Sequence, residues 1–249
     1  MNKNSIKKAW LEKFPYFCLS GKDNKRFLNG VTTSNILLES NNIVKTCWLD
    51  PKGILKALLE VHFIENQLFL VVIEGNANEI KDYFEQIIFP ADDVKISDIK
   101  FILRIQEVDD LMSWRDYKSN LLKETNKDDF ISKNYLSVMD KYELIRWKIS
   151  QAIPVEGLEI NGKNNPLELG LVDLIDSKKG CYLGQETISR LKNNNSIKQE
   201  IRLWKSNLPL KNIELKKHKI FLNEKREKVV GNITSYAVTD AKGQIGLAL

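Results

Sequence analysis

The chain has 249 residues, 43% of them hydrophobic and 29% charged, and its formal net charge is +5. A chain of this length forms one large or two modest domains, and its hydrophobic share is sufficient for an ordinary core. The mild positive charge argues against a dedicated nucleic-acid binder, because such proteins cluster their basic residues more clearly.

Three widely spaced cysteines, Cys18, Cys47 and Cys181, form no Cys-x-x-Cys pair. This spacing argues against a disulfide framework and a structural zinc site, and free thiols suit a reducing cytoplasm. Residues 1–12 lack the apolar segment of a signal peptide, and the longest aliphatic or aromatic run, 68–73, is too short to span a membrane. We therefore expect a cytoplasmic protein with no metal site and no membrane contact.

The first half of the chain predicts an antiparallel sheet with helices packed on it. The expected elements are a helix over 24–28 capped by Ser20 or Asp23 and ended by Asn29-Gly30, strands over 41–49, 54–64 and 68–73, a helix over 76–88 ended by Pro90, and two short strands within 94–105. The Asp-Pro-Lys-Gly turn at 50–53 joins the first two strands. This order favours an α+β fold with ferredoxin-like units over a doubly wound parallel sheet.

The second half begins with a polar region, 109–137, that carries little structural signal. A helix is expected over 139–150, with Tyr142, Ile145 and Ile149 on one stripe. The polar run at 193–196 is the predicted boundary between a domain over 1–195 and a small β-domain over 196–249. Expected strands of the small domain are 199–204, 213–215, 219–221, 229–236 and 243–249, and the basic segment 211–228 is interpreted first as a solvated face and second as an RNA contact.

Two lysines and two glycines surround the third cysteine in the segment 178–186, ahead of a short predicted helix over 186–191. A helix start and neighbouring ammonium groups lower the pKa of a thiol and favour the reactive thiolate. The glycines permit a tight turn and the close approach of another molecule to the backbone. The pattern makes Cys181 a candidate nucleophile that Lys178 and Lys179 activate, although a lone cysteine is more often a small buried hydrophobe.

The eight residues of the motif Lys179–Glu186, KGCYLGQE, resemble the signature of the YgfZ family, the folate-binding relatives of the glycine-cleavage T-protein. Weaker similarity runs from Leu19 to Thr234 and includes the segment 19–36, the turn at 50–53 and the segment 142–154. The family usually has glycine where this chain has Ala152, and more sequence in the region 109–137.

The resemblance implies a T-protein-like folate-binding fold with two ferredoxin-like subdomains, the second reduced around 109–137, and a small, minimal or truncated C-terminal β-barrel. It also implies tetrahydrofolate as cofactor and a role in maturing or repairing iron–sulfur enzymes, including those that modify tRNA. These enzymes and folate are the implied partners, with no direct nucleic-acid contact. The implied catalytic residues are Cys181 and Lys179, and the implied folate contacts are Arg146, Glu168, Lys52, Tyr182 and Gln185.

Several alternatives to these roles remain open. Arg146 offers a planar fork for a carboxylate or a ring, but it also suits a surface salt bridge, and Lys52 suits a solvated turn. A folate-dependent aminomethyltransferase of the T-protein type has the same fold, although T-proteins have a different sequence at the cysteine motif. A scaffold without chemistry is the third reading. Only His62 and His218 are available as a base, and no hydrolase or nucleotide-binding motif occurs.

Overall fold

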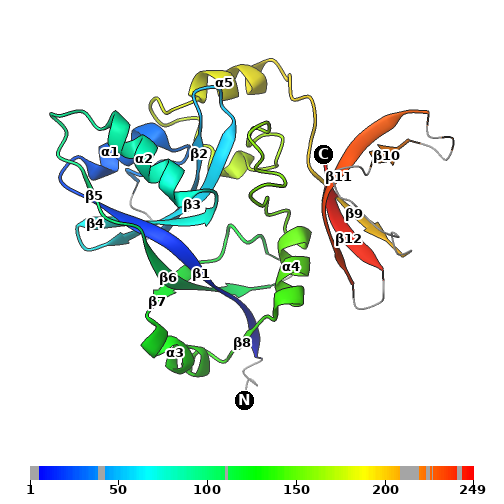
Figure 1. Ribbon diagram of the computed structural model, residues 1–249, viewed down its shortest axis with the longest axis horizontal. Coiled ribbons are helices and arrows are strands. Elements are labelled where there is room, and N and C mark those ends of the chain that lie inside the picture. The colour runs from blue at the N-terminus through cyan, green and yellow to red at the C-terminus, as the bar shows by residue number, and fades with distance from the viewer. Residues whose placement is uncertain are drawn as a thin grey trace.

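The computed structural model describes residues 6–38, 43–109, 112–207, 219–222, 225, 227–239 and 243–249. These residues form two antiparallel-rich sheets with helices packed against them (Figure 1). The large sheet has the strand order β2-β3-β4-β1-β6-β7, with β5 and β8 also paired to β1, and the small sheet has the order β10-β11-β12-β9. Among the described residues no helix is both long and apolar enough to span a membrane.

In the first half of the chain the expected strands and helices form close to their expected bounds, but the long strand Lys7–Ser20 was not predicted from the sequence. The large sheet consists of β1 (Lys7–Ser20), β2 (Ile43–Leu49), β3 (Leu55–Ile64), β4 (Gln67–Glu74), β5 (Lys95–Ile96), β6 (Lys100–Val108), β7 (Ser119–Leu122) and β8 (Leu136–Val138). The small sheet consists of β9 (Arg202–Ser206), β10 (Lys219–Phe221), β11 (Val229–Val238) and β12 (Gln244–Ala248). The helices are α1 (Asn24–Val31), α2 (Ala77–Ile87), α3 (Lys127–Lys133), α4 (Lys141–Ser150) and α5 (Gln185–Asn193), with 3-10 turns at Glu124–Asn126 and Val172–Leu174.

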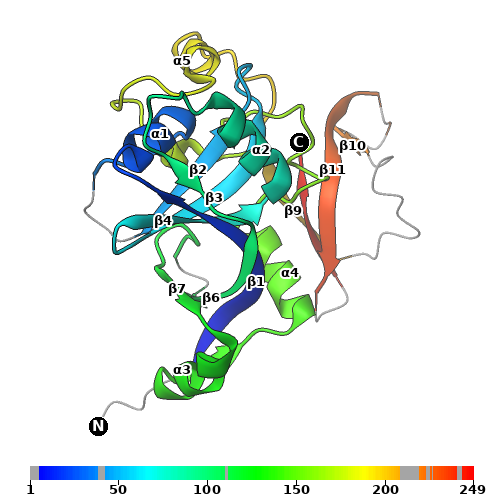
Figure 2. The same ribbon diagram turned by 60° about the vertical axis from the view of Figure 1, so that its left-hand side comes forward.

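The long strand β1 separates two hydrophobic cores, because successive side chains of a strand point to opposite faces of the sheet. Phe17 and Leu19 face the second core, where α1 and α2 cover the sheet (Figure 2). Trp10 and Phe14 face the first core, which contains residues of α4, of the segment 167–174 and of β12. Each face of the sheet is therefore covered by different parts of the chain.

The end of α1 differs from the expectation. Asn29-Gly30 does not end this helix, which continues to Val31, and the N–H of Thr32 closes its last turn on the carbonyl of Leu28. Val31 is buried in the second core, so tertiary packing extends the helix beyond a residue pair that often stops one. The Asn29 side chain instead accepts the N–H of Ile36 at 2.9 Å.

Helix α4 forms where the sequence predicts it, and Asp140 caps it by accepting the N–H groups of Tyr142 and Glu143 at 2.8 Å each. Only Ile149 of the predicted stripe is buried; Tyr142 is 74% exposed, and the buried face of the helix consists of Leu144, Trp147 and Ile149. The reason is a tertiary contact: the Trp147 ring lies 5.5 Å from that of Trp10. After α4, Ala152 has a φ of 49° in the left-handed region, which accounts for the glycine usual at this position.

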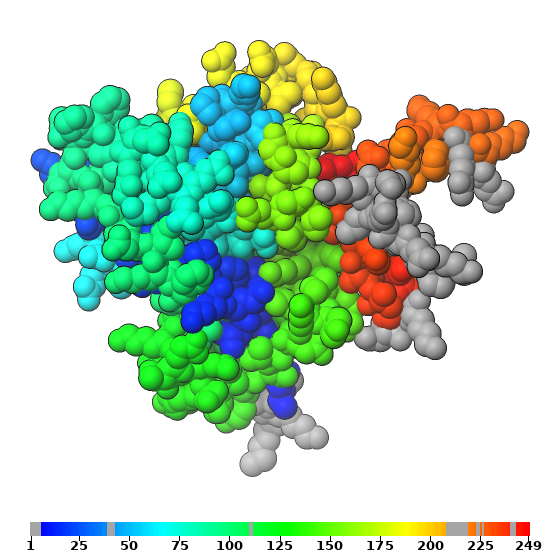
Figure 3. All heavy atoms as spheres, viewed as in Figure 1, coloured from blue at the N-terminus to red at the C-terminus, as the bar shows by residue number. Residues whose placement is uncertain are grey.

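The small sheet packs against α4 through β11 and β12, and the space-filling view shows the C-terminal strands beside this helix (Figure 3). The expected strands over 219–221, 229–236 and 243–249 form as β10, β11 and β12, whereas the one over 213–215 and most of the basic segment 211–228 lie outside the described residues. The predicted domain boundary falls between α5 and β9 and stays a prediction. Because Leu247 of β12 belongs to the first core, the two sheets share hydrophobic packing.

Candidate functional site

The motif loop, Lys179–Glu186, is anchored to α1 by the buried side chain of Lys179, which is 7% exposed. Its ammonium group donates to the carbonyl oxygens of Asn29 at 2.6 Å, Thr32 at 2.7 Å and Ser34 at 2.7 Å. These carbonyls lie at and just beyond the C-terminal end of α1, where the helix dipole favours a positive charge. The lysine therefore joins two segments about 150 residues apart in the sequence.

The same contacts limit the part that Lys179 can take in catalysis. An ammonium group has three N–H donors, and all three are used by the backbone carbonyls. Burial lowers the pKa of Lys179 to about 8, and the negative charge of Asp176 opposes this shift. The ammonium also lies 5.3 Å from the centre of the Tyr182 ring. These contacts assign Lys179 a positioning role, and its activation of the thiol stays a prediction.

A second anchor joins the motif to the turn between β2 and β3. Gly184 has a φ of 79°, and a Cβ there would lie 2.7 Å from the carbonyl oxygen of Asp50. Gly53 has a φ of 77°, and a Cβ there would lie 3.1 Å from the Cβ of Thr187. Both positions thus require glycine for their backbone conformation and for the close approach of the two turns. The exposed Lys52 belongs to this turn and so lies near the motif.

Between the two anchors, neighbouring side chains of the motif point to different environments. The Cys181 thiol is exposed, whereas Tyr182 is buried in the first core, and burial raises the pKa of Tyr182 to about 12. The Gln185 side chain accepts the N–H of Tyr182 at 3.4 Å and closes the turn. The predicted thiol is therefore presented to solvent by a loop fixed on both sides, and Tyr182 and Gln185 help to shape that loop.

The other two predicted folate contacts are Arg146 and Glu168. Arg146 lines a polar pocket of about 500 Å³ with Lys7, Lys8 and Glu143, and Cys181 does not line this pocket. The carboxylate of Glu168 accepts the N–H of Asn165 at 3.0 Å, within its own turn. The structure thus brings the backbone of the turn that carries Lys52 close to the motif residues Lys179, Cys181, Tyr182 and Gln185, and places Arg146 in a pocket that Cys181 does not line. Their contacts with folate stay predictions.

A buried polar cluster on the first-core face of the sheet was missed in the sequence. Arg104 donates to the two carboxylate oxygens of Glu60 at 3.0 and 2.7 Å, and Glu60 also contacts Nε2 of His62 at 2.6 Å and the Ser119 hydroxyl. Burial by itself would raise the pKa of Glu60, but the charge of Arg104 overcomes it and holds this pKa well below its usual range. Glu60 and His62 alternate with apolar residues in β3, and this pattern was the available signal.

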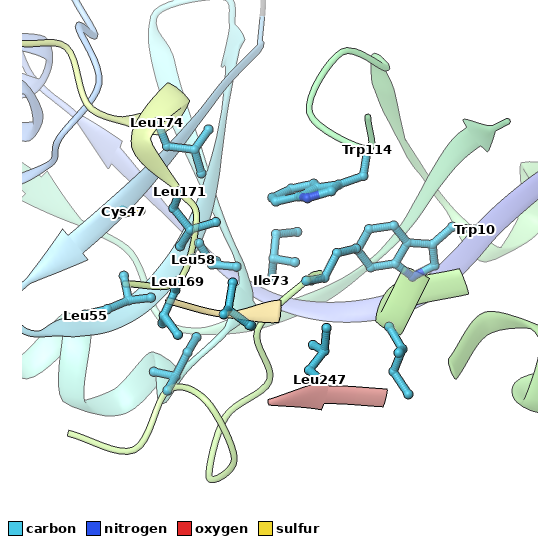
Figure 4. Packing of buried hydrophobic residues seen from close by; sticks show 14 of the residues in the cluster. Trp10, Cys47, Leu55, Leu58, Ile73, Trp114, Leu169, Leu171, Leu174 and Leu247 are labelled. Carbon is cyan, nitrogen blue, oxygen red and sulfur yellow. The ribbon is translucent and has the colours of Figure 1, made fainter. Parts of the chain in front are cut away.

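Several buried polar atoms have no hydrogen-bond partner in the described structure. They include the donors Nη1 of Arg104, Nε1 of Trp114 and Nε1 of Trp147, and the acceptor Oε1 of Glu159. The Arg104 guanidinium lies 4.5 Å from the centre of the Trp10 ring, and the rings of Trp10 and Trp114 point toward the same part of the first core (Figure 4). Buried donors without partners are uncommon, and a polar ligand is one way to satisfy them.

Metal binding has no comparable support in the residues that the structure describes, since no group of three or more histidine, cysteine, aspartate or glutamate side chains there could hold an ion.

No protein-family model matches the chain. It is 29% identical over 223 residues to the tRNA-modifying protein YgfZ of Buchnera aphidicola, a match that covers 75% of this chain and 69% of that protein. It is 25% identical over 246 residues to a putative chloroplastic transferase of Arabidopsis thaliana, covering 80% of this chain and 56% of that protein. The chain thus spans little more than half the length of the Arabidopsis relative.

A solved structure, the glycine cleavage system aminomethyltransferase T from Bartonella henselae, matches the fold with a TM-score of 0.70. The match covers 98% of this chain and 79% of that chain at 11% sequence identity, so it concerns the fold alone. The predicted α+β class and T-protein-like architecture are confirmed. Sequence and structure together show that this chain is related to the YgfZ proteins and has the fold of the glycine-cleavage T-protein.

Proposed function

We propose that the chain is a YgfZ-like protein that binds tetrahydrofolate and assists the maturation or repair of iron–sulfur enzymes, including tRNA-modifying ones, through Cys181. The observation that carries this proposal is the exposed thiol on a loop anchored by Lys179 and Gly184. A reactive residue gains from such a fixed position, because the backbone beside it does not need to be ordered during the reaction. The proposed location is the cytoplasm, and the proposed partners are the iron–sulfur enzymes themselves.

The first core supports folate binding by the chemistry of its polar atoms. A pterin ring carries a carbonyl group and ring nitrogens that accept hydrogen bonds, and the partnerless donors of Arg104, Trp114 and Trp147 fit these acceptors. The pterin also carries N–H groups, which fit the buried oxygen of Glu159. Aromatic residues around Trp10 supply flat apolar contacts. Arg146 and Glu168 remain the proposed contacts for other parts of folate.

Tetrahydrofolate, when bound, supplies a carrier for one-carbon units. The residues of this chain hold the ligand and present a thiol. Cys181 then has three roles open to it: accepting a one-carbon unit, acting as a redox thiol, or briefly contacting iron or sulfide. A single thiolate does not hold a cluster by itself, since clusters usually take four ligands.

The test is a calorimetric titration with tetrahydrofolate that removes single indole N–H donors. Trp114→Phe and Trp147→Phe each delete one partnerless donor of the first core. We expect each variant to bind roughly 5-fold more weakly, the loss of one hydrogen bond. Trp48→Phe is the matched control, because its buried indole N–H also lacks a partner but lies in the second core. Equal affinities for all three variants and the unmodified chain would contradict a folate site in the first core.

An aminomethyltransferase of the T-protein type is the second candidate, and the fold match is the observation that favours it. Its test is the folate-dependent release of ammonia from an aminomethyl group carried by a lipoylated protein. Turnover in the Cys181→Ala variant would favour the transferase, since the T-protein reaction does not depend on that cysteine. If neither the unmodified chain nor the Cys181→Ala variant releases ammonia, the YgfZ-like role is favoured.

A further inference from the structure

A pocket of about 950 Å³ lies between α1, the end of α2 and the motif loop, and we call it the motif pocket. Its lining is mostly apolar and includes Phe27, Val31, Tyr83, Ile87, Phe89 and Leu183. Cys181 also lines it, so the exposed thiol adjoins an apolar surface. The sequence indicated the thiol but not this pocket, which α1, α2 and the motif form only together.

The volume of the motif pocket, about 950 Å³, falls within the range of small-molecule sites. Small-molecule sites are concave, mostly apolar and about 300–1,000 Å³ in volume. Phe89 is 72% exposed at the pocket, so part of its apolar wall faces solvent in the described structure.

The charges in the lining do not select for an ion. Arg26 lies at the pocket, but its guanidinium is 2.6 Å from a carboxylate oxygen of Asp92 and 3.5 Å from one of Asp23. Asp92 is itself a lining residue, so the positive and negative charges offset each other. A ligand that matches this lining is uncharged in the part that enters the pocket.

We propose that the motif pocket binds the apolar or aromatic part of an uncharged small molecule and brings its thiol-reactive end to Cys181. This goes beyond the proposed folate site, whose partnerless donors lie around the first core, while the pocket residues Phe27, Tyr83, Ile87 and Leu183 pack against the second. In this proposal Cys181 reacts with a ligand that binds in the motif pocket and not at the folate site.

Two alkylating reagents with one reactive group test the proposal: iodoacetamide and N-benzyl iodoacetamide. With either reagent the Cys181 thiolate attacks the CH2 carbon, a carbon–sulfur bond forms, and iodide leaves with the electron pair of the carbon–iodine bond. The measured quantity is the ratio of the benzyl rate to the plain rate, divided by the same ratio for free N-acetylcysteine. The Cys18→Ser background removes the half-buried thiol, and Cys47 is fully buried with its pKa raised by burial to about 12.

We expect a ratio of about 10 or more, which corresponds to about 1.4 kcal/mol of binding by the benzyl group. Gly30→Phe should bring the ratio close to one. Gly30 lines the pocket inside α1, and a Cβ there meets no atom within 4 Å, so the new ring has room to occupy the pocket. Gly30→Ala is the matched control, since it also removes the flexible helix glycine but adds little volume, and it should keep the high ratio.

A second variant tests the proposal even if Gly30→Phe does not fold. Phe89→Glu changes an exposed side chain and places a charge in the apolar lining, so it should also lower the ratio. A ratio near one in the unmodified pocket, or a high ratio that survives Phe89→Glu and a folded Gly30→Phe, would overturn the proposal. Titrating tetrahydrofolate into benzyl-alkylated protein separates the two proposals, because folate binding in the first core should persist when the motif pocket is blocked.

Discussion

The motif loop and the polar cluster of the first core differ in whether their hydrogen-bond donors have partners within the protein. In the motif loop, Lys179 uses all three ammonium donors within the protein, and Cys181 is exposed. Around Arg104, the structure buries an ion pair and also leaves donors without partners. The hydrogen-bond donors of Lys179 are thus satisfied within the protein, whereas several donors near Arg104 have no partner among the described residues. The difference fits the proposed division between a reactive site at the motif loop and a binding site in the first core.

The largest effect should come from breaking the ion pair of the first core. Glu60→Gln removes the charge that offsets the fully buried Arg104, and we expect a loss of roughly 3–5 kcal/mol in the free energy of unfolding. Urea denaturation measures it. Asp129→Asn is the control, since its partner Lys133 and Asp129 itself are mostly exposed and should contribute almost nothing. Similar urea midpoints for Glu60→Gln and Asp129→Asn would show that another group replaces Glu60 as the partner of Arg104.

Removing the lysine anchor should have the next largest effect. Lys179→Met leaves three backbone carbonyls without their donor, and we expect it to cost about 2–3 kcal/mol in stability, measured by urea denaturation. The variant should also change the pH dependence. The pKa of Lys179 is about 8 in the folded chain, below the unfolded value of 10.5, so the unfolded state binds more protons between these values.

The sign of that dependence follows from proton linkage. Because the unfolded chain holds the extra proton, the contribution of Lys179 to the free energy of unfolding rises as pH increases from about 8 toward 10.5. Denaturation curves of the unmodified chain and of Lys179→Met, compared over this range, isolate the contribution. Lys45, whose burial also lowers its pKa to about 8, stays in both proteins and cancels in the comparison. Parallel curves would indicate that Lys179 keeps its ordinary pKa.

The glycine anchor should have a moderate effect. Gly184→Ala places a methyl group 2.7 Å from the Asp50 carbonyl oxygen at a φ of 79°. Gly162→Ala is matched in backbone conformation, with a φ of 75°, but its methyl group meets nothing within 4 Å. We expect Gly162→Ala to lose roughly 1 kcal/mol from conformation alone, and Gly184→Ala to lose more from the added clash. Thermal melting compares them, and equal melting temperatures would mean that the turn at 50–53 moves aside.

The smallest effect on stability should accompany the largest effect on function. Cys181→Ala removes an exposed thiol, so the free energy of unfolding should change by no more than about 0.5 kcal/mol. Activity in an iron–sulfur enzyme maturation assay should be lost. The comparison with Cys47→Ala, which removes a fully buried thiol from the first core, shows the cost of a structural cysteine. A large loss of stability with activity intact would show that Cys181 has a structural role and no role in activity.

Local patterns in the sequence determined much of the fold. Alternating apolar residues around the Asp-Pro-Lys-Gly turn predicted β2 and β3, and the residues from Asn76 to Pro90 predicted α2 together with its limits. The eight-residue motif indicated the relationship to YgfZ that the sequence comparison confirms. These features depend on periodicity, turns and caps, which act between residues close in the chain.

The roles of individual site residues were decided only by the tertiary structure. Lys179 meets carbonyls about 150 residues away, Glu60 meets Arg104 at a separation of 44, and the motif pocket needs two helices and a loop at once. Arg146, which the sequence predicts as a folate contact, lines a pocket that Cys181 does not line. Such contacts depend on how strands register and how helices pack against the sheet. The sequence by itself therefore determined many of the elements, the relationship and the choice of Cys181 as the candidate thiol. Long-range packing decided which side chains are anchors, which are buried donors and what the thiol faces.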